Sequence, residues 1–405
     1  MREVVIVAAA RTPIGKYAGA LRHIRPDDLS ALVLKELTKR ASVDPIDVED
    51  VMWGCSNQAG EDNRNVARMA LLAADFPENV AGATLNRLCG SGLQAINSAA
   101  HAIASDCGDV FIAGGVESMT RAPYVMPKPE AEFPRGPQIF DTTLGARMYN
   151  PKLVARGYPP LSMGETAENV AEKYRITRRE QDEFALASQH KTGNAQRTGG
   201  FDAEILPVTL PANGKVKDPN YVPEVFRVDE HPRPGVTLEQ LAKLKPAFRD
   251  GGSVTAGNSS GINDGAAGIV LMAADEAKHR GLTPIAKIVA SAVAGVDPNC
   301  MGLGPIPATQ KALARAGLRV DDLDLVELNE AFASQSIACV RELELPMERV
   351  NVNGGAIALG HPLGCSGARI LVTLLHAMQA RGAKRGLATM CIGVGQGIST
   401  IVERV

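Results

Sequence analysis

The turns Cys89-Gly-Ser-Gly92 and Gly364-Cys-Ser-Gly367 begin two stretches of the sequence that follow one pattern. Each turn of small residues precedes an apolar segment with the period of a helix, and each of these precedes a short apolar run, at residues 109–113 and 386–390. Glycines follow both runs. We interpret each copy as a turn, a buried helix and a buried strand, which makes the pair an internal duplication of one α/β unit. The duplication predicts two similar halves whose equivalent loops meet near a pseudo-symmetry axis.

The same mixture of strand and helix patterns extends beyond these two copies. Continuous apolar runs at residues 4–10 and 110–113 predict strands that are buried on both faces. Helical periodicity lies between them, for example at residues 29–40 and 92–104. Strands that alternate with helices predict an α/β fold built from packed layers. The abundance of glycine, at 40 residues, indicates close packing of the backbone in these layers.

Proline is concentrated in one third of the chain, because 15 of the 25 prolines fall between residues 120 and 250. This density excludes a mostly regular strand structure there. Two capping boxes, Ser162 to Glu165 and Thr177 to Glu180, nevertheless predict helices inside it. We therefore expect a loop-rich insertion in the first half, which is a usual place for a binding surface. The expected domains are residues 1–120 with 251–275 as the first half, 121–250 as the insertion, and 276–405 as the second half.

Length and composition exclude several classes of protein. A chain of 405 residues exceeds the usual size of one hydrophobic core, so we expect more than one domain. A content of 45% apolar and 22% charged residues excludes a disordered chain. The formal net charge of −2, without a basic run, argues against nucleic-acid binding. No apolar run is long enough to insert across a membrane.

The seven cysteines follow neither a metal-binding nor a disulfide pattern. Their number is odd and the sequence contains no CxxC pair, so we predict no zinc site and no disulfide framework. Free thiols indicate a reducing compartment, and we expect the protein to be cytoplasmic. The other possible role for a cysteine is that of a catalytic nucleophile.

Cys89 lies in a turn directly before a predicted helix. A helix N-terminus presents N–H groups and partial positive charge, which lower the pKa of a nearby thiol and favour the thiolate. The neighbouring glycines allow backbone amides to approach a reacting carbonyl group. The alternative interpretation is a small buried residue at a tight turn.

Three further residues lie at similar positions. His361 belongs to the second turn-before-helix copy, so the duplication predicts that it lies near the counterpart of Cys89, where it can act as a base on the thiol. Cys391 ends a predicted strand and is followed by glycines, and Asn329 follows another strand where a helix is expected to begin. Packing is the alternative role for His361 and Cys391, and a helix N-cap is the alternative for Asn329. Taken together, two thiols, an imidazole and an amide at such positions predict one shared site.

Six motifs, in this order along the whole chain, resemble those of the thiolases, which are acyltransferases that make or cleave 3-oxoacyl-coenzyme A. The resemblance implies a fold of two similar α/β halves in five layers, αβαβα, with a loop domain inserted in the first half. The motifs are Asn86-Arg-Leu-Cys-Gly-Ser-Gly92, Gly115-Val-Glu-Ser-Met119, Thr255-Ala-Gly-Asn-Ser-Ser-Gly261, Asn329-Glu-Ala-Phe332, Asn353-Gly-Gly through Gly360-His-Pro362, and Cys391-Ile-Gly393.

The resemblance also implies roles for single residues. Cys89 is similar to the nucleophile that becomes acylated, His361 to the base that activates it, and Cys391 to the acid/base that moves a proton on the acetyl α-carbon. One oxyanion hole would consist of His361 and a water held by Asn329, and the other of the backbone amides of Cys89 and Gly393. The residues that match coenzyme A contacts of the family are Arg233, Ala256 and Ser260, and those that match its acyl pocket are Met163, Met301 and Phe332.

The same resemblance implies the partners. Acyl-CoA and coenzyme A would be substrates, no metal or other cofactor would be needed, and the chain would form a homodimer or homotetramer. Ser162 stands where short-chain biosynthetic thiolases often have histidine. The stretches Asp141-Thr-Thr-Leu-Gly145 and Asp62-Asn-Arg-Asn-Val-Ala-Arg68 instead resemble the 3-oxoadipyl-CoA and general degradative branch, which includes β-oxidation of fatty acids.

Two alternatives stay beside the thiolase interpretation. A ketosynthase-like condensing enzyme would typically combine one cysteine with two histidines, or with one histidine and one asparagine, and the second thiol, Cys391, argues against it. A non-catalytic acyl-CoA-binding protein on the same fold is less consistent with the presence of Cys89, His361 and Cys391 together.

Overall fold

The structure is a computed structural model that describes residues 2–211 and 222–405. The predicted insertion, residues 121–250, includes residues 212–221, which lie outside the described residues. None of the helices in the described part of the chain has both the length and the apolar character that crossing a membrane requires.

The first half is built on a sheet that mixes antiparallel and parallel pairs. Strand β1 pairs with β10 and β10 with β5, both antiparallel, and β5 then pairs with β3 and β3 with β4, both parallel. The strands in this order are β1 (Val4–Arg11), β10 (Asn263–Ala273), β5 (Val110–Ser118), β3 (Asp50–Gly54) and β4 (Ala81–Leu85).

The second half repeats this strand order. Strand β11 pairs with β14 and β14 with β13, both antiparallel, and β13 pairs in parallel with β12. A parallel bridge from Val326 to Val350 lies where β4 lies in the first half. The duplication predicted from the two turns is therefore confirmed in the topology. The strands are β11 (Ala286–Gly295), β14 (Gln396–Arg404), β13 (Arg385–Ile392) and β12 (Leu325–Leu328).

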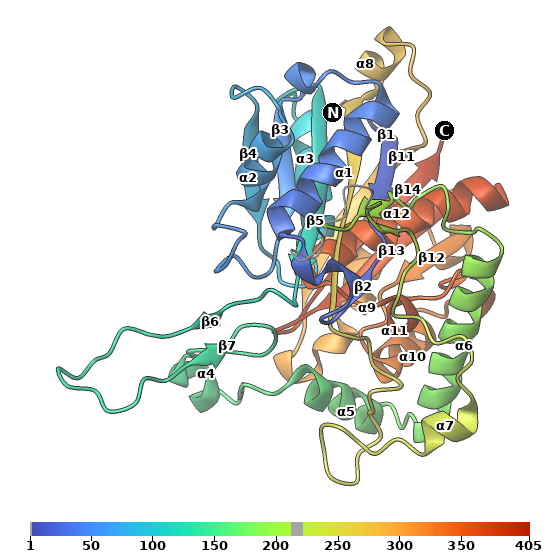
Figure 1. The fold of residues 1–405 in the computed structure, drawn as a ribbon. Helices are drawn as coiled ribbons and strands as arrows, with labels where there is room; N and C mark the ends of the chain where they lie inside the picture. Colours follow the sequence, from blue (N-terminus) through green and yellow to red (C-terminus); the bar gives the residue numbers. More distant parts are fainter. Residues whose placement is uncertain (1, 212–221) are drawn as a thin grey trace.

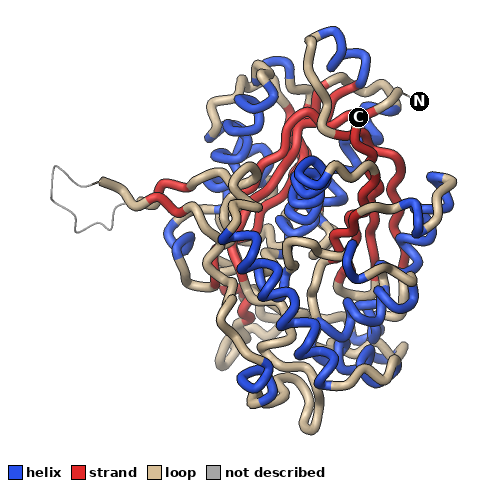
Figure 2. Tube along the Cα trace, turned by 90° about the vertical axis from the view of Figure 1, so that its right-hand side faces the viewer, coloured by secondary structure: helices blue, strands red, loops and turns tan. Residues whose placement is uncertain are grey.

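Helices separate and cover the two sets of strands (Figure 1). Helices α3 (Ser91–Ala104) and α12 (Leu363–Arg381) pack against each other and against strands of both halves, and Figure 2 shows helices between the two groups of strands. On one outer face lie α1 (Pro26–Ala41) and α2 (Val66–Ala73). On the other lie α9 (Pro305–Ala316) and α10 (Ala333–Glu342). This is the expected αβαβα order of layers.

Two glycines allow the central helices to approach each other. A Cβ on Gly92 would lie 2.7 Å from the carbonyl oxygen of Gly364 and 2.9 Å from the amide nitrogen of Ala368. A Cβ on Gly367 would collide with the backbone of Leu93. Both repeated turns thus contain glycine because two backbones meet there, as the small-residue pattern predicted.

Strand β5 differs from the sequence prediction. We expected the strand to end at Gly114 and Gly115, but it continues through Ser118. The glycines are needed inside the strand, because a Cβ on Gly115 would collide with the carbonyl oxygen of Gly364 at the start of α12. They mark a close crossing of two segments and not the end of one.

The segment between β5 and β10 carries the expected helices in long connections. Both capping boxes form, Ser162 with Glu165 at α5 (Met163–Lys173) and Thr177 with Glu180 at α6 (Arg178–Arg197). Residues before α5 project sideways from the layers (Figure 1). Helix α6 packs on α10 and on α11 (Ala356–Leu359) of the second half. Glu204 and Asp229 of the same segment form ion pairs with Arg11 of β1, so the segment contacts both halves.

Candidate active site

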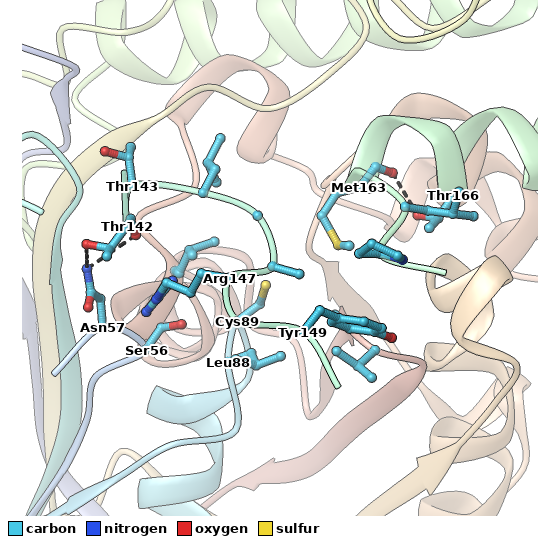
Figure 3. Close-up of a pocket in the computed structure, with 18 of the residues that line it drawn as sticks. Ser56, Asn57, Leu88, Cys89, Thr142, Thr143, Arg147, Tyr149, Met163 and Thr166 are labelled. Atoms are coloured by element: carbon cyan, nitrogen blue, oxygen red, sulfur yellow. Dashed lines mark hydrogen bonds between the residues drawn. The ribbon is translucent and has the colours of Figure 1, made fainter. Parts of the chain in front are cut away.

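Cys89 lies on a cavity of about 300 Å³ between the two halves and the segment that joins β5 to β10 (Figure 3). Glu117 comes from the end of β5, Gly393 from the turn after β13, and Met163 from the first residue of α5. The layers thus bring together residues that are far apart in the sequence, including Cys89 and Gly393, both of which were predicted to belong to the site.

The turn that holds Cys89 has an unusual backbone. Leu88, the residue before it, has a positive φ of 47°, which is uncommon for a side chain of this kind. Two hydrogen bonds stabilise that conformation: the amide of Leu88 donates to Asn86 Oδ1 at 2.9 Å, and the Ser91 hydroxyl donates to the Leu88 carbonyl at 2.6 Å. Asn86 and Ser91 belong to a quoted motif, but the sequence interpretation gave them no role.

The Cys89 thiol is neutral at rest, contrary to the expected thiolate. Burial raises the pKa of Cys89 to about 11, although the amides of Gly393 and of Cys89 itself oppose the shift. The amides at the start of α3 do not compensate, because Gly90 and Ser91 donate theirs to the carbonyl groups of Arg87 and Leu88. The expectation was wrong because loss of hydration outweighs the helix terminus.

The second thiol lies deeper. Cys391 has 1% of its surface exposed, and burial raises the pKa of its thiol well above the usual value, as does the charge that a Cys89 thiolate would place beside it. It packs in one apolar cluster with Met301 and Phe332, with Met163 at its edge. Met163 also lines the Cys89 cavity, whereas Met301 and Phe332 lie behind it around Cys391.

His361 is buried and held by hydrogen bonds on both ring nitrogens. Its Nδ1 lies 2.6 Å from the Ser366 hydroxyl, which itself donates to the Pro362 carbonyl at 2.8 Å. Because the hydroxyl has a single hydrogen, it must accept from His361 Nδ1–H, which leaves the lone pair on Nε2. The amide Nδ2 of Asn329 faces that Nε2 at 3.5 Å. Burial, with the charge of Arg369, lowers the pKa of His361 to about 3, so the imidazole is neutral.

Asn329 is not a helix N-cap. Helix α10 begins at Ala333 and Phe332 occupies its N-cap position. Between them Phe332 is extended, and the Ala331 carbonyl and the Ala333 amide form hydrogen bonds with Ser260 and Asn258. The Asn329 side chain points instead toward His361, and its buried Oδ1 has no hydrogen-bond partner among the described residues. The structure thus places the predicted imidazole and amide together.

The three residues predicted to contact coenzyme A line a second cavity, of about 770 Å³. They are Arg233, Ala256 and Ser260. Leu144 lines both this cavity and the one at Cys89, so the two adjoin at that residue. The predicted coenzyme A contacts therefore lie in a cavity next to the one that holds Cys89.

Glu117 lies in a quoted motif but was given no role by the sequence interpretation. Its carboxylate accepts hydrogen bonds from the amides of Ser56 at 2.9 Å, Asn57 at 3.1 Å and Gly364 at 2.7 Å. Burial raises the pKa of Glu117 to about 7. The residue joins the loop after β3 to the first turn of α12, and so fixes the two halves relative to each other beside the cavity.

Comparisons with known proteins agree with this architecture. A model of the thiolase N-terminal domain matches residues 4–275 and one of the thiolase C-terminal domain matches residues 282–404. The 3-oxoadipyl-CoA/3-oxo-5,6-dehydrosuberyl-CoA thiolase of Escherichia coli is 54% identical over 408 residues, with 100% of both chains covered.

Two solved structures have the same fold. The crystal structure of the Bacillus anthracis acetyl-CoA acetyltransferase has a TM-score of 0.93 and 45% identity, covering 100% of this chain and 99% of that one. The human mitochondrial 3-ketoacyl-CoA thiolase in complex with CoA has a TM-score of 0.92 and 41% identity, covering 100% and 98%. The chain belongs to the thiolase family, the acyltransferases that cleave 3-oxoacyl-CoA with coenzyme A or catalyse the reverse condensation.

Proposed function

We propose that this thiolase cleaves 3-oxoadipyl-CoA with coenzyme A to succinyl-CoA and acetyl-CoA, through a thioester on Cys89. The substrate is suggested by the name of the relative that is 54% identical over the whole chain. The mechanism rests on one observation above all: the neutral Cys89 thiol lies on its cavity, close enough to the neutral, buried Cys391 thiol for a charge on Cys89 to raise the pKa of Cys391. The buried imidazole of His361, which Ser366 and Asn329 contact, is neutral as well.

In the first step Cys89 attacks the 3-oxo carbonyl carbon, and Nε2 of His361 takes the thiol proton. A thiol with a raised pKa and an imidazole with a lowered pKa stay neutral until substrate arrives, so the proton moves as the carbon–sulfur bond forms. The backbone amides of Cys89 and Gly393, which face the thiol, stabilise the oxyanion of the tetrahedral intermediate.

In the second step the carbon–carbon bond breaks and acetyl-CoA leaves as an enolate. His361, now protonated, and a water held by Asn329 stabilise the enolate oxygen. A water that donates one hydrogen to the unpartnered Oδ1 of Asn329 can donate the other to that oxygen. Cys391 gives its proton to the α-carbon, a role that suits a buried thiol kept neutral until carbanion character develops.

A second coenzyme A completes the cycle. Its thiol attacks the succinyl thioester on Cys89 and gives its proton to the Cys391 thiolate, while protonated His361 returns a proton to Cys89. Both catalytic thiols and the imidazole are then neutral again. Arg233, Ala256 and Ser260 would hold the coenzyme A moiety, while Met163, Met301 and Phe332 would shape the apolar surroundings of the reacting carbons.

We also propose the wider setting. The enzyme would act in the cytoplasm in degradative metabolism, β-oxidation being the family's general setting, as a homodimer or homotetramer with coenzyme A as its substrate and no separate cofactor. The domains that we propose are residues 1–120 with 251–275, residues 121–250, and residues 276–405.

The second thiol, Cys391, favours thiolysis over a ketosynthase-like reaction. The presence of Cys89, His361 and Cys391 together favours catalysis over acyl-CoA binding alone.

The proposal is tested by following coenzyme A-dependent loss of 3-oxoadipyl-CoA and acetoacetyl-CoA, and by digesting the enzyme after incubation with succinyl-CoA. We expect turnover of 3-oxoadipyl-CoA and a succinyl group on the peptide that contains Cys89. Turnover of acetoacetyl-CoA alone would refute the substrate, and a succinyl group on another cysteine would refute the nucleophile.

A further inference from the structure

The proposed steps leave one charged side chain of the Cys89 cavity without a role. Glu117 and Arg147 are the residues with a formal charge among those that line this cavity. Figure 3 draws Arg147 among the lining residues together with Cys89, and no hydrogen bond is marked to it. Arg147 lies in the segment between β7 (Phe140–Asp141) and α4 (Pro151–Ala155), close to Leu144, where the two cavities adjoin.

Most other polar groups around Arg147 already have partners. The Asn57 amide donates to Thr142 Oγ1 at 2.8 Å, and the Thr142 hydroxyl donates to the Pro123 carbonyl at 2.5 Å. The Tyr149 hydroxyl donates to the Tyr158 carbonyl at 3.1 Å. These groups build the wall of the cavity and leave few donors for a ligand.

Arg147 differs from them. Its side chain is half-buried, and within residues 2–211 and 222–405 its guanidinium forms neither a hydrogen bond nor an ion pair. A guanidinium has five N–H donors in a planar fork that matches the two oxygens of a carboxylate. The cavity wall is apolar at Leu88, Met119 and Leu161, and a charge-assisted hydrogen bond is stronger in apolar surroundings than in water.

Glu117 does not neutralise this guanidinium. No ion pair joins the two, and the carboxylate of Glu117 instead accepts hydrogen bonds from three backbone amides, those of Ser56, Asn57 and Gly364. Burial of Glu117 also favours its uncharged form, which reduces its repulsion of a second carboxylate in the cavity. The positive charge of Arg147 is therefore available to a ligand.

We propose that Arg147 forms a subsite for the terminal carboxylate of a dicarboxylic acyl chain whose other end is bound to Cys89. This inference rests on the proposed function and extends it to a residue that decides between dicarboxylic and neutral acyl chains. A succinyl group on Cys89 carries one free carboxylate, and Arg147 is the cationic group that shares the cavity with the sulfur.

A phosphate group of coenzyme A is the other anion that Arg147 could meet. The residues that line the second cavity, where the coenzyme A contacts lie, include Arg233 but not Arg147. The position of Arg147 on the thioester side therefore favours the acyl chain.

The test compares two substrates of equal length, 3-oxoadipyl-CoA and 3-oxohexanoyl-CoA, which differ in the terminal carboxylate. Arg147→Met should lower kcat/KM for 3-oxoadipyl-CoA by about 10- to 100-fold, the usual effect of losing a hydrogen-bonded charge partner, and change the value for 3-oxohexanoyl-CoA by less than about 3-fold. Arg147→Lys should keep part of the preference, because it keeps the charge and loses the fork. Arg156→Met, on an exposed arginine of the same segment, should change neither value.

The outcomes separate the subsite from the proposed substrate. A wild-type enzyme that prefers 3-oxohexanoyl-CoA refutes the substrate and, with it, the subsite. A wild-type preference for 3-oxoadipyl-CoA that survives in Arg147→Met refutes the subsite alone. Equal losses on both substrates, or a raised KM for free coenzyme A, assign Arg147 to the coenzyme A moiety or to folding of the segment.

Discussion

The two repeated turns, Cys89-Gly-Ser-Gly92 and Gly364-Cys-Ser-Gly367, have almost the same sequence but different tasks. Their final glycines have the same role, since each allows α3 and α12 to approach each other closely. Their first residues differ: Cys89 faces a cavity, whereas a Cβ on Gly364 would lie 2.5 Å from the Val116 carbonyl oxygen and 2.8 Å from Glu117. The duplicated fold thus keeps the packing symmetric, and only one of the two turns carries the cysteine that we propose as the nucleophile.

The serines of the two turns show the same division. Ser91 donates to the carbonyl of Leu88 and stabilises the turn before Cys89, and Ser366 donates to the carbonyl of Pro362. Ser366 additionally accepts from His361. In the proposed mechanism one copy therefore supplies the nucleophilic thiol, and the other supplies the base, His361, with Ser366 as its hydrogen-bond partner. Variants at matched positions of the two copies test this comparison.

The largest difference in turnover is expected between variants of the two cysteines in the turns. Cys89→Ser should reduce turnover by a factor on the order of 10³ or more, because the nucleophile is lost. Cys365→Ala, in the other copy, removes a fully buried thiol whose pKa burial raises to about 12, and should keep acylation and turnover. Steady-state kinetics with mass analysis of the acylated peptide measures both. Comparable losses in the two variants would contradict the asymmetry.

The next largest loss of activity should separate the roles that we propose for Cys89 and Cys391. Cys391→Ala should lose carbon–carbon cleavage and exchange of the acetyl α-protons by about 10²- to 10⁴-fold, the usual contribution of a general acid or base. It should still accept an acyl group on Cys89, because that half-reaction forms no carbanion. His361→Ala should impair acylation itself.

Acylation and α-proton exchange are measured separately in each of these variants. If Cys391→Ala lost acylation and kept α-proton exchange, the two roles would be reversed.

Much of the architecture could be predicted because it depends on local pattern. The helices near residues 29–40 and 92–104 appear within a few residues of their expected places, as α1 and α3. Both capping boxes form as their spacing predicted, since a capping box involves residues three apart. The two repeated turns predicted that the halves share one topology.

The errors concern properties that depend on residues distant in the sequence. The sequence predicts a strand end at Gly114 and Gly115, because the residue that approaches Gly115, Gly364, belongs to the other half. The pKa of Cys89 was expected to fall, but its direction is decided by burial, which no local pattern reports. Ser366 and Arg147 received no role, because their relation to the site arises only when the loops assemble.

A smaller effect on activity is expected from the two serines. Ser366→Ala removes the acceptor that orients His361 and selects its Nδ1–H form, so kcat should fall about 10- to 100-fold with little change in KM. Ser91→Ala removes the bond to the Leu88 carbonyl and should mainly lower stability, by about 1 kcal/mol. Kinetics and urea unfolding of both variants provide the check, and a Ser366→Ala enzyme with unchanged kcat would show that His361 is oriented without it.

The smallest effect is expected on stability and should be similar in the two copies. Alanine favours a helix over glycine by about 1 kcal/mol, so Gly92→Ala and Gly367→Ala would stabilise α3 and α12 if nothing opposed the new methyl groups. Each methyl group would instead meet backbone of the opposite helix, and overpacking of this kind costs about 1–3 kcal/mol. Both variants should therefore be less stable than the wild type in urea unfolding, despite the gain in helix propensity. Gly295→Ala is the control, because its nearest contact would be the Gly395 carbonyl at 3.9 Å, and it should change stability little. A stabilising effect at either turn would mean that the central helices can separate there without loss, and that the small-residue pattern of the two copies has another cause.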